Sequence, residues 1–255
     1  MAVRLEVDDH VAVLTLDDAG RRNAVTADLS RAVRTAVAQI RGRAEVRAVV
    51  LTGAGPAFSA GGDVDSLAAR SEPLSVFSEG VTALAELTIP TVAAVNGPAV
   101  GAGMNWALAC DVIIAARSAR FDPCFLDIGI HPGGGHLWRL QNLVGRQATA
   151  AMVLFGEALD GEQAAALGLA WQVVDDDQLM PAALRLARRA AGRSGELVRR
   201  TKETLAVSTT LSDARAALDL ETDAQRWSMD RPAFAEGVAR LRRRLHKGSR
   251  QTTQT

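Results

Sequence analysis

Three apolar stretches constrain the fold of this chain more than any other feature. They occupy residues 47–53 (RAVVLTG), 91–97 (TVAAVNG) and 111–116 (DVIIAA), and each is short for a helix. Strands form continuous apolar runs when both faces of their sheet are covered, as in parallel sheets. Helical patterns separate the stretches, and strands that alternate with helices predict an α/β fold.

The residues before these stretches predict a hairpin followed by a helix. Residues 3–7 (VRLEV) and 11–16 (VAVLTL) flank the polar turn from Asp8 to His10, which favours a β-hairpin. Thr26 can cap the next helix, because a threonine hydroxyl accepts hydrogen bonds from the free amides at a helix start. The apolar residues of this helix recur at helical spacing: Leu29, Val33, Val37 and Ile40.

Helical patterns dominate the rest of the chain. Three helical segments lie between residues 136 and 170, and WQVV at 171–174 favours a short strand. From Asp176 onward only helices are expected. Asp230 is predicted to cap the last of them, with Pro232 in its first turn. The polar tail SRQTTQT is expected to be disordered.

Composition and charge exclude several classes of function. Lys plus Arg and Asp plus Glu both number 29, so no net field attracts nucleic acid or an anionic membrane. The basic last helix is interpreted as a solvated face rather than an RNA-binding surface. Cys110 and Cys124 are too few for a disulfide scaffold and are expected to be reduced. With no signal peptide or transmembrane stretch apparent, a cytoplasmic location is expected.

Several common catalytic and cofactor-binding motifs are incomplete in this sequence. Trp106 stands where the third glycine of a dinucleotide fingerprint belongs after Gly101, and Phe58 does the same after Gly53. Ala57 replaces the first glycine of a nucleophile elbow. The histidines lack the spacing of metal ligands, so no metal site is predicted.

Two glycine loops remain, FSAGGDV at 58–64 and GPAVGAGMN at 97–105. Each follows a predicted strand and precedes a predicted helix, where backbone amides lack partners and the helix dipole adds positive charge. Two such amides can stabilise an oxygen that gains negative charge during a reaction. The alternative is that the glycines only permit tight turns and close packing.

Five sequence blocks then point to a family. They are RRNAV at 21–25, FSAGGDV at 58–64, PTVAAVNGPAVGAGMNWALACDVIIAARSARF at 90–121, GIHPGGG at 129–135 and LFGEALDGEQAAALGLAWQVV at 154–174. In this order and spacing they resemble the enoyl-CoA hydratase/isomerase (crotonase) family over residues 1–195. MDRPAFAEGVARL at 229–241 resembles the family's final helix.

The resemblance implies the architecture and the ligand. The expected fold is a spiral of ββα units over residues 1–195, with a coenzyme A cleft. A helical region at 196–255 is expected to make oligomer contacts and cover the pocket. Homotrimers that pair into hexamers, an acyl-CoA thioester as substrate in fatty acid metabolism, and no prosthetic group are also implied.

The resemblance also assigns residues to the site. Gly62 and Ala102 would donate backbone hydrogen bonds to the thioester oxygen, within loops that include Gly61 and Gly101. Asn23 and Ala24 would help hold the adenine end of coenzyme A. Arg21 and Arg22 would meet its phosphates, Ala60 would face the adenine, and Asp63 would sit in the same loop as the cap of the following helix.

This chain departs from the family at both catalytic acids. The two glutamates of a hydratase fall at Asn105 and Phe125, and a third acid, used by some isomerases, falls at Gly133. An amide can hold water but cannot take its proton, and phenylalanine can do neither. The chain is therefore expected to keep acyl-CoA binding and enolate stabilisation, while hydration is in doubt.

Other residues can be proposed to replace the acids. His131 and His136 are candidate bases, and Asp127 is spaced to meet His131 on one helical turn. Trp106 and Trp138 are interpreted as packing residues. The chain is thus predicted to be an enoyl-CoA hydratase/isomerase-family lyase or isomerase. Two alternatives stay open: an acyl-CoA-binding protein with little or no turnover, or an isomerase, hydrolase or decarboxylase that uses His131 or His136.

Overall fold

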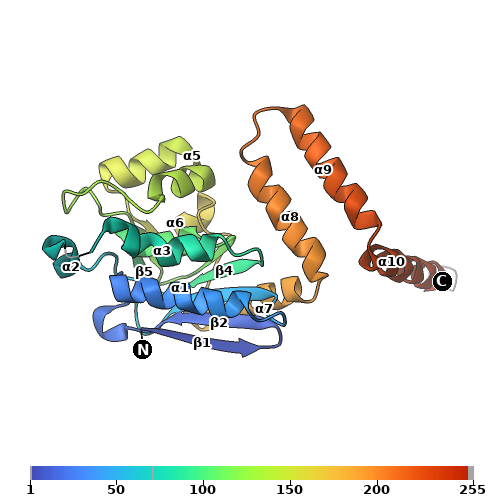
Figure 1. Cartoon of the computed structure of the whole chain (residues 1–255), viewed down its shortest axis with the longest axis horizontal. Helices are drawn as coiled ribbons and strands as arrows, with labels where there is room; N and C mark the ends of the chain where they lie inside the picture. The colour runs from blue at the N-terminus through green and yellow to red at the C-terminus, as the bar shows by residue number, and fades with distance from the viewer. Residues whose placement is uncertain (1, 71, 252–255) are drawn as a thin grey trace. The chain divides into compact units, whose positions relative to one another are not determined.

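The chain divides into two compact units, one at Met1–Gly192 and one that begins at Arg193. A computed structural model describes residues 2–70 and 72–251 (Figure 1). Within the described ranges, no helix is both long and apolar enough to cross a membrane.

A six-stranded sheet forms the centre of the first unit, in the order β1-β2-β3-β4-β6-β9. The β1–β2 pair is antiparallel, which confirms the predicted hairpin, and every later pair of neighbours is parallel. The sheet therefore confirms the α/β class. Its strands are β1 (Val3–Asp8), β2 (Val11–Leu16), β3 (Ala48–Gly53), β4 (Thr91–Val95), β6 (Val112–Ala116) and β9 (Gln172–Val174).

Both faces of the inner strands β3, β4 and β6 are buried, which explains their continuous apolar runs. Alternate side chains of β3 enter different cores: Val49 and Leu51 pack in the core that includes α1, whereas Ala48 and Val50 pack in the core that includes α7. Figure 1 shows α1 (Ala27–Arg41) and α3 (Leu74–Ala85) side by side, and α7 (Leu179–Ala191) packs on β3, β4 and β6.

A second, three-stranded sheet was not predicted. It joins β5 (Pro98–Val100), β7 (Arg120–Asp122) and β8 (Leu159–Asp160). β5 leads directly into the short 3-10 helix η2 (Gly101–Gly103) and then α4 (Met104–Leu108). The small sheet thus anchors the second glycine loop.

Side-chain caps fix where several helices begin. Thr26 Oγ1 accepts from the Leu29 amide at 3.0 Å, as predicted. Asp63 caps α2 (Val64–Ala69), and Asp160 forms a capping box at α6 (Gly161–Ala166). A further 3-10 turn, η1 (Ala19–Arg21), follows the hairpin.

The helix α5 (His136–Phe155) is two helical segments joined at a break, which fits the two segments predicted there. Gly145 lies at the break with φ 75° and ψ 172°, a backbone conformation that favours glycine. The 3-10 turn η3 (Asp176–Gln178) then leads into α7.

The second unit contains α8 (Gly195–Ser208), α9 (Ala214–Met229) and α10 (Pro232–Gln251). Pro232 begins α10 as predicted, but the assignment of Asp230 as its cap is wrong. Asp230 ends α9 instead, because only Arg231 separates the two helices. The predicted disordered tail is also wrong at 249–251, which continue α10, and its remaining residues, 252–255, lie outside the described residues.

Close packing of α3 depends on Gly80. A Cβ at this position would lie 2.6 Å from the Ser30 carbonyl oxygen and 2.8 Å from a ring carbon of Trp106. The Gly80 amide also donates to Ser30 Oγ at 3.0 Å. No side chain larger than hydrogen fits there without a shift of backbone.

We expect Gly80→Ala to destabilise the protein by about 1–3 kcal/mol, because an added methyl overpacks a filled core. Gly20→Ala is the matched control, since nothing lies within 4 Å of the Cβ it would add. Urea unfolding of both variants measures the difference. Equal midpoints would contradict the close packing described here.

Candidate active site

A cavity of about 470 Å³ opens in the first unit, between the two glycine loops, the α2–α3 region and residues 124–134. Its wall includes Leu74, Phe77 and Val81 of α3, which sequence reasoning missed. Only the apolar periodicity of residues 74–85 could have indicated this wall. The predicted site residues that line the cavity are Ala60, Gly61, Gly62, Gly101, Ala102, Asn105, Phe125 and His131.

The pairing of Val25 with the first glycine loop fixes the direction of the Gly62 peptide groups. Val25 donates to the Gly61 carbonyl at 2.6 Å and accepts from the Asp63 amide at 3.1 Å, as a parallel bridge. In such a bridge the middle residue uses neither of its own groups. The Gly62 N–H therefore faces away from Val25, and among the described residues no hydrogen-bond partner is found for it.

The Ala102 amide is free for a different reason. Ala102 is the second residue of η2, and the first amides of a helix have no partner inside it. Gly101 begins this turn with φ +47°, and a Cβ there would lie 3.5 Å from Cys124 Sγ. Within the part of the chain that is described, the Ala102 N–H likewise has no hydrogen-bond acceptor.

Asn23 braces the loops from inside the protein and does not line the cavity. It is fully buried; its Nδ2 donates to the carbonyls of Ala54, Ala57 and Phe58, and its Oδ1 accepts from the Asp18 amide. Its side chain is thus committed to the protein.

The residues beside Asn23 lie at the edge of this brace. Ala24 is buried next to it, and neither Ala24 nor Arg22 lines the cavity. Arg22 is exposed, and its carbonyl accepts from the Ala60 amide at 2.9 Å. Arg21 is paired with Asp18 at 2.7 Å.

Asp63 serves the helix that follows it. Its carboxylate accepts from Ser66 N at 2.9 Å and from Ser66 Oγ at 2.6 Å, and these bonds lower the pKa of Asp63. It does not line the cavity. The predicted cap is confirmed, and the carboxylate is occupied.

Asn105 is held at both ends of its amide. Its Nδ2 donates to the Gly133 carbonyl at 3.0 Å, and its Oδ1 lies 2.9 Å from His136 Nδ1. Since Oδ1 can only accept, Nδ1 of His136 must carry the hydrogen. Asn105 is 4 % exposed, and His136 only 1 %.

His136 is a neutral donor in this arrangement. Burial, followed by the charge of Arg139, lowers the pKa of His136 to about 4. Its Nε2 is buried without a partner among the residues described, so a proton added there would have no acceptor. His136 also does not line the cavity, so the geometry gives it no access to a bound ligand.

His131 is the histidine that lines the cavity. Its Nδ1 lies 2.8 Å from the Pro132 carbonyl, which can only accept, so Nδ1 donates, and in the neutral ring Nε2 is then the acceptor. Asp127 is exposed and lies outside the cavity lining. The predicted partnership of Asp127 and His131 is therefore not seen among their hydrogen bonds.

The cavity lining, as far as the chain is described, contains no carboxylate. Its titratable side chains are His131 and Cys124. Burial, and then the charges of Asp122 and Asp127, raise the pKa of the Cys124 thiol, which keeps it protonated near neutral pH. Over the same described residues, no group of three or more His, Cys, Asp or Glu side chains could hold a metal ion.

The two tryptophans proposed as packing residues differ. Trp106 is fully buried, which confirms its packing role, and it contacts the Gly80 region of α3. Trp138 is 65 % exposed on α5, so a packing role within this chain is wrong. Helical spacing cannot distinguish a buried face from an exposed apolar one.

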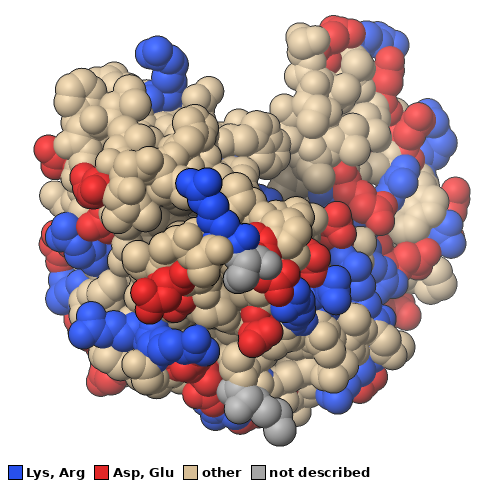
Figure 2. All heavy atoms as spheres, turned by 60° about the vertical axis from the view of Figure 1, so that its left-hand side comes forward, with Lys and Arg blue, Asp and Glu red and all other residues tan. Residues whose placement is uncertain are grey.

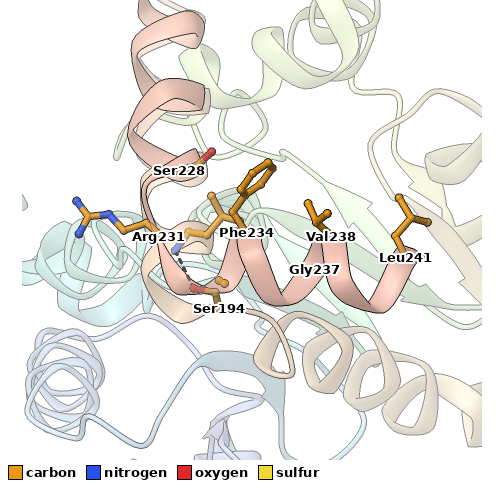
Figure 3. Close-up of a pocket in the computed structure, with 9 residues that line it drawn as sticks. Ser194, Ser228, Arg231, Phe234, Gly237, Val238 and Leu241 are labelled. Atoms are coloured by element: carbon orange, nitrogen blue, oxygen red, sulfur yellow. Dashed lines mark hydrogen bonds between the residues drawn. The ribbon is translucent and has the colours of Figure 1, made fainter. Parts of the chain in front are cut away.

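A second cavity, of about 320 Å³, lies within the second unit. Figure 3 shows Phe234, Val238 and Leu241 projecting from one side of α10 toward it. Arg231, which also borders it, lies over the Trp227 ring at 4.6 Å. This cavity contains none of the predicted site residues and offers no group for proton transfer.

The surface carries both signs of charge. Figure 2 shows Lys and Arg side chains intermixed with Asp and Glu on the face in view. Near the cavity wall, Arg31 pairs with Glu72 and Arg34 with Glu79, both at 2.7 Å. These pairs connect α1 to the α3 segment.

Comparisons with known proteins agree with this fold. The enoyl-CoA hydratase/isomerase family model matches residues 6–247. The "Probable enoyl-CoA hydratase EchA14" of Mycobacterium tuberculosis is 43 % identical over 95 % of this chain and 98 % of its own length. The 1,2-epoxyphenylacetyl-CoA isomerase of Escherichia coli is 35 % identical over 91 % of this chain and 92 % of its own.

A solved structure gives the same result. The crystal structure of enoyl-CoA hydratase from Bacillus anthracis matches 96 % of this chain and 97 % of its own, with a TM-score of 0.89 and 27 % identity. The fold is that of the crotonases. The chain belongs to the enoyl-CoA hydratase/isomerase family, whose members act on acyl-CoA.

The neutral state of His136 makes folding dependent on pH. The pKa of an unfolded histidine is about 6.5, whereas the pKa of His136 in the folded protein is about 4. Between these values the unfolded chain binds more protons, so stability falls as the pH falls. From pH 7.5 to 4.5 we expect this residue alone to remove about 2–3 kcal/mol.

The variant His136→Asn tests this expectation, because asparagine keeps a donor but does not titrate. Urea unfolding of both proteins at pH 7.5 and 4.5 gives the two losses. The natural protein should lose more stability than the variant over this interval. Equal losses would show that His136 is not buried in its neutral form.

Proposed function

We propose that this chain is an acyl-CoA enzyme that forms a thioester enolate in the cavity. The N–H groups of Gly62 and Ala102 would donate to the thioester oxygen as it becomes negative. Support comes from the two amides, each on a cavity-lining loop and each without a hydrogen-bond partner among the described residues. Each donor of this kind contributes roughly a hundred- to thousand-fold to a rate.

His131 is the base we propose for the proton next to the thioester. It is the cavity-lining side chain whose neutral form carries an acceptor ring nitrogen, whereas the Cys124 thiol keeps its proton. Its fixed Nδ1–H leaves Nε2 as the acceptor. Asn105 and Phe125 would contact the acyl group without exchanging protons.

A proton shift within the substrate is the reaction that this cavity favours. Hydration needs one group to activate water and another to handle the α-proton, and the described lining supplies one base and an amide. Isomerisation can use a single base twice. The absence of a carboxylate among the described lining residues is the observation that carries this choice.

Coenzyme A would be held by the turn at Arg22 and by the loop that follows β3. Arg22 is exposed, while Arg21 is paired with Asp18. Ala60 lines the cavity, and its amide donates to the Arg22 carbonyl, so a backbone hydrogen bond joins the two segments. The ligand enters as substrate, and no prosthetic group is proposed.

An acyl-CoA-binding protein with little turnover is the second candidate. It is favoured by the same absence of carboxylates and by the exposure of His131 at the cavity edge. Both candidates use the cavity and its two amides. They differ in whether a proton moves.

We also propose that the chain forms homotrimers, alone or paired into hexamers. In the second unit, α8 and α9 contain no buried residue, so these helices lack a core of their own. Large apolar side chains on them are exposed, among them Leu205, Val207, Leu218 and Met229. Such surfaces are typical of association sites.

Sedimentation of the natural protein tests the assembly. We expect a trimer or hexamer at micromolar concentration. Leu218→Glu places a charge on this apolar surface and should shift the mass toward the monomer, whereas Asp219→Glu, on the neighbouring exposed position, should not. A monomeric natural protein would contradict this assembly.

Exchange of the α-proton in D2O tests enolate formation without assuming the overall reaction. Mass spectrometry of butanoyl-CoA should detect deuterium in the presence of the natural protein. His131→Asn should slow this exchange by about a hundred- to ten-thousand-fold. His10→Asn is the matched control, because His10 also bonds a carbonyl through Nδ1, that of Glu45 at 2.8 Å, but lies on the β1–β2 turn.

Two other outcomes would change this proposal. If no exchange occurs while butanoyl-CoA raises the melting temperature, the binding protein is favoured, because a ligand of the folded state stabilises it. If His131→Asn exchanges at the natural rate, His131 is not the base.

A further inference from the structure

The orientation of the Asn105 amide is determined by its partners. The Gly133 carbonyl can only accept, so the group facing it at 3.0 Å must be Nδ2. A flipped amide would oppose two acceptor oxygens there and face Nδ1–H of His136 with its own N–H groups. The orientation seen is the one in which both contacts are hydrogen bonds.

The two ends of this amide face different surroundings. The Nδ2 end lies beside Gly133 and Gly134, which both line the cavity; a Cβ on Gly134 would be 2.8 Å from Nδ2. The Oδ1 end lies against His136, which is buried and does not line the cavity. The cavity is therefore offered the donor end of Asn105.

One hydrogen of Nδ2 has no acceptor among the residues that the structure describes. An asparagine amide carries two N–H donors, and among the described residues Nδ2 has Gly133 as its acceptor. The cavity around it is largely apolar, with Val25, Leu67, Phe77 and Ile130 in its lining. An unpaired donor in such surroundings is costly, so a ligand that supplies an acceptor gains affinity.

His136 keeps this arrangement because it stays neutral. Phe125 packs against its ring at 4.9 Å in an edge-on contact, and the charge near it is that of Arg139. Nothing in these contacts favours the imidazolium. Its Nδ1–H is thus a constant donor to Oδ1 of Asn105.

We propose that His136 positions Asn105 so that a free N–H faces the bound acyl group, and that the cavity selects acyl-CoA substrates with an oxygen acceptor near the thioester. A hydroxyl, ether or carbonyl oxygen on the acyl chain supplies this chemistry. The inference rests on the proposed function, because it places the acyl group in this cavity. Asn105 contacts the substrate, and His136 is a positioning residue.

Calorimetric binding of two saturated ligands tests the selection. Butanoyl-CoA and 3-hydroxybutanoyl-CoA, each enantiomer measured, differ by one hydroxyl. One enantiomer should bind the natural protein about ten-fold or more tightly than butanoyl-CoA. Asn105→Ala should abolish this preference.

Binding of coenzyme A alone distinguishes failure of the proposed function from failure of the selection by Asn105. If neither acyl-CoA binds more tightly than coenzyme A, the acyl group does not use the cavity, and the proposed function fails. If both acyl-CoA ligands bind equally and more tightly than coenzyme A, only the selection by Asn105 is overturned.

Two substitutions of His136 test the positioning role. His136→Leu removes the donor to Oδ1, so the preference for the hydroxyl should fall toward that of Asn105→Ala. His136→Asn can place an N–H near the site of Nδ1 and should keep most of it. If His136 had only a structural role, both variants would bind both ligands more weakly, and to the same extent. A folded His136→Leu variant that keeps the full preference for the hydroxyl would overturn the positioning role of His136.

Discussion

The bridge between Val25 and the first glycine loop is the interaction on which the site depends. It uses the carbonyl of Gly61 and the amide of Asp63, which leaves the peptide groups of Gly62 facing the other side. Asn23 supports this bridge from the protein interior, with hydrogen bonds to three carbonyls of residues 54–58. The groups offered to a ligand are thus main-chain groups whose direction is set by the fold.

Much of this fold could be predicted from local patterns. β3, β4 and β6 are apolar on both faces, and Thr26 stands directly before a helical repeat, so each is evident in a short window. β5, β7 and β8 are two or three residues long, and their pairing joins segments far apart in the chain. Their formation depends on tertiary hydrogen bonds that no local pattern encodes. The exposure of Trp138 likewise depends on what covers α5.

The sequence indicates the part of the site that the two glycine loops form. It does not indicate the part that depends on contacts between side chains. Glycine spacing and the family resemblance indicate the loops of Gly62 and Ala102, and the structure places both on one cavity. The bond between Asn105 and His136 spans 31 residues, and its direction follows from the carbonyl of Gly133. Sequence alone treats Asn105 as a lost acid and His136 as a candidate base. The hydrogen bonds make them donors that act together.

The brace at Asn23 has a consequence for how such a protein can change over time. Because the backbone that would hold the thioester is secured from the interior, the side chains around the acyl group are free to be exchanged while the polypeptide path stays the same. Residues such as Asn105 and Phe125 can then alter which acyl group is preferred and what becomes of it, without displacing the main-chain groups that would hold the thioester. In this architecture, the main-chain groups that would hold the thioester are physically separate from the side chains that would determine the reaction.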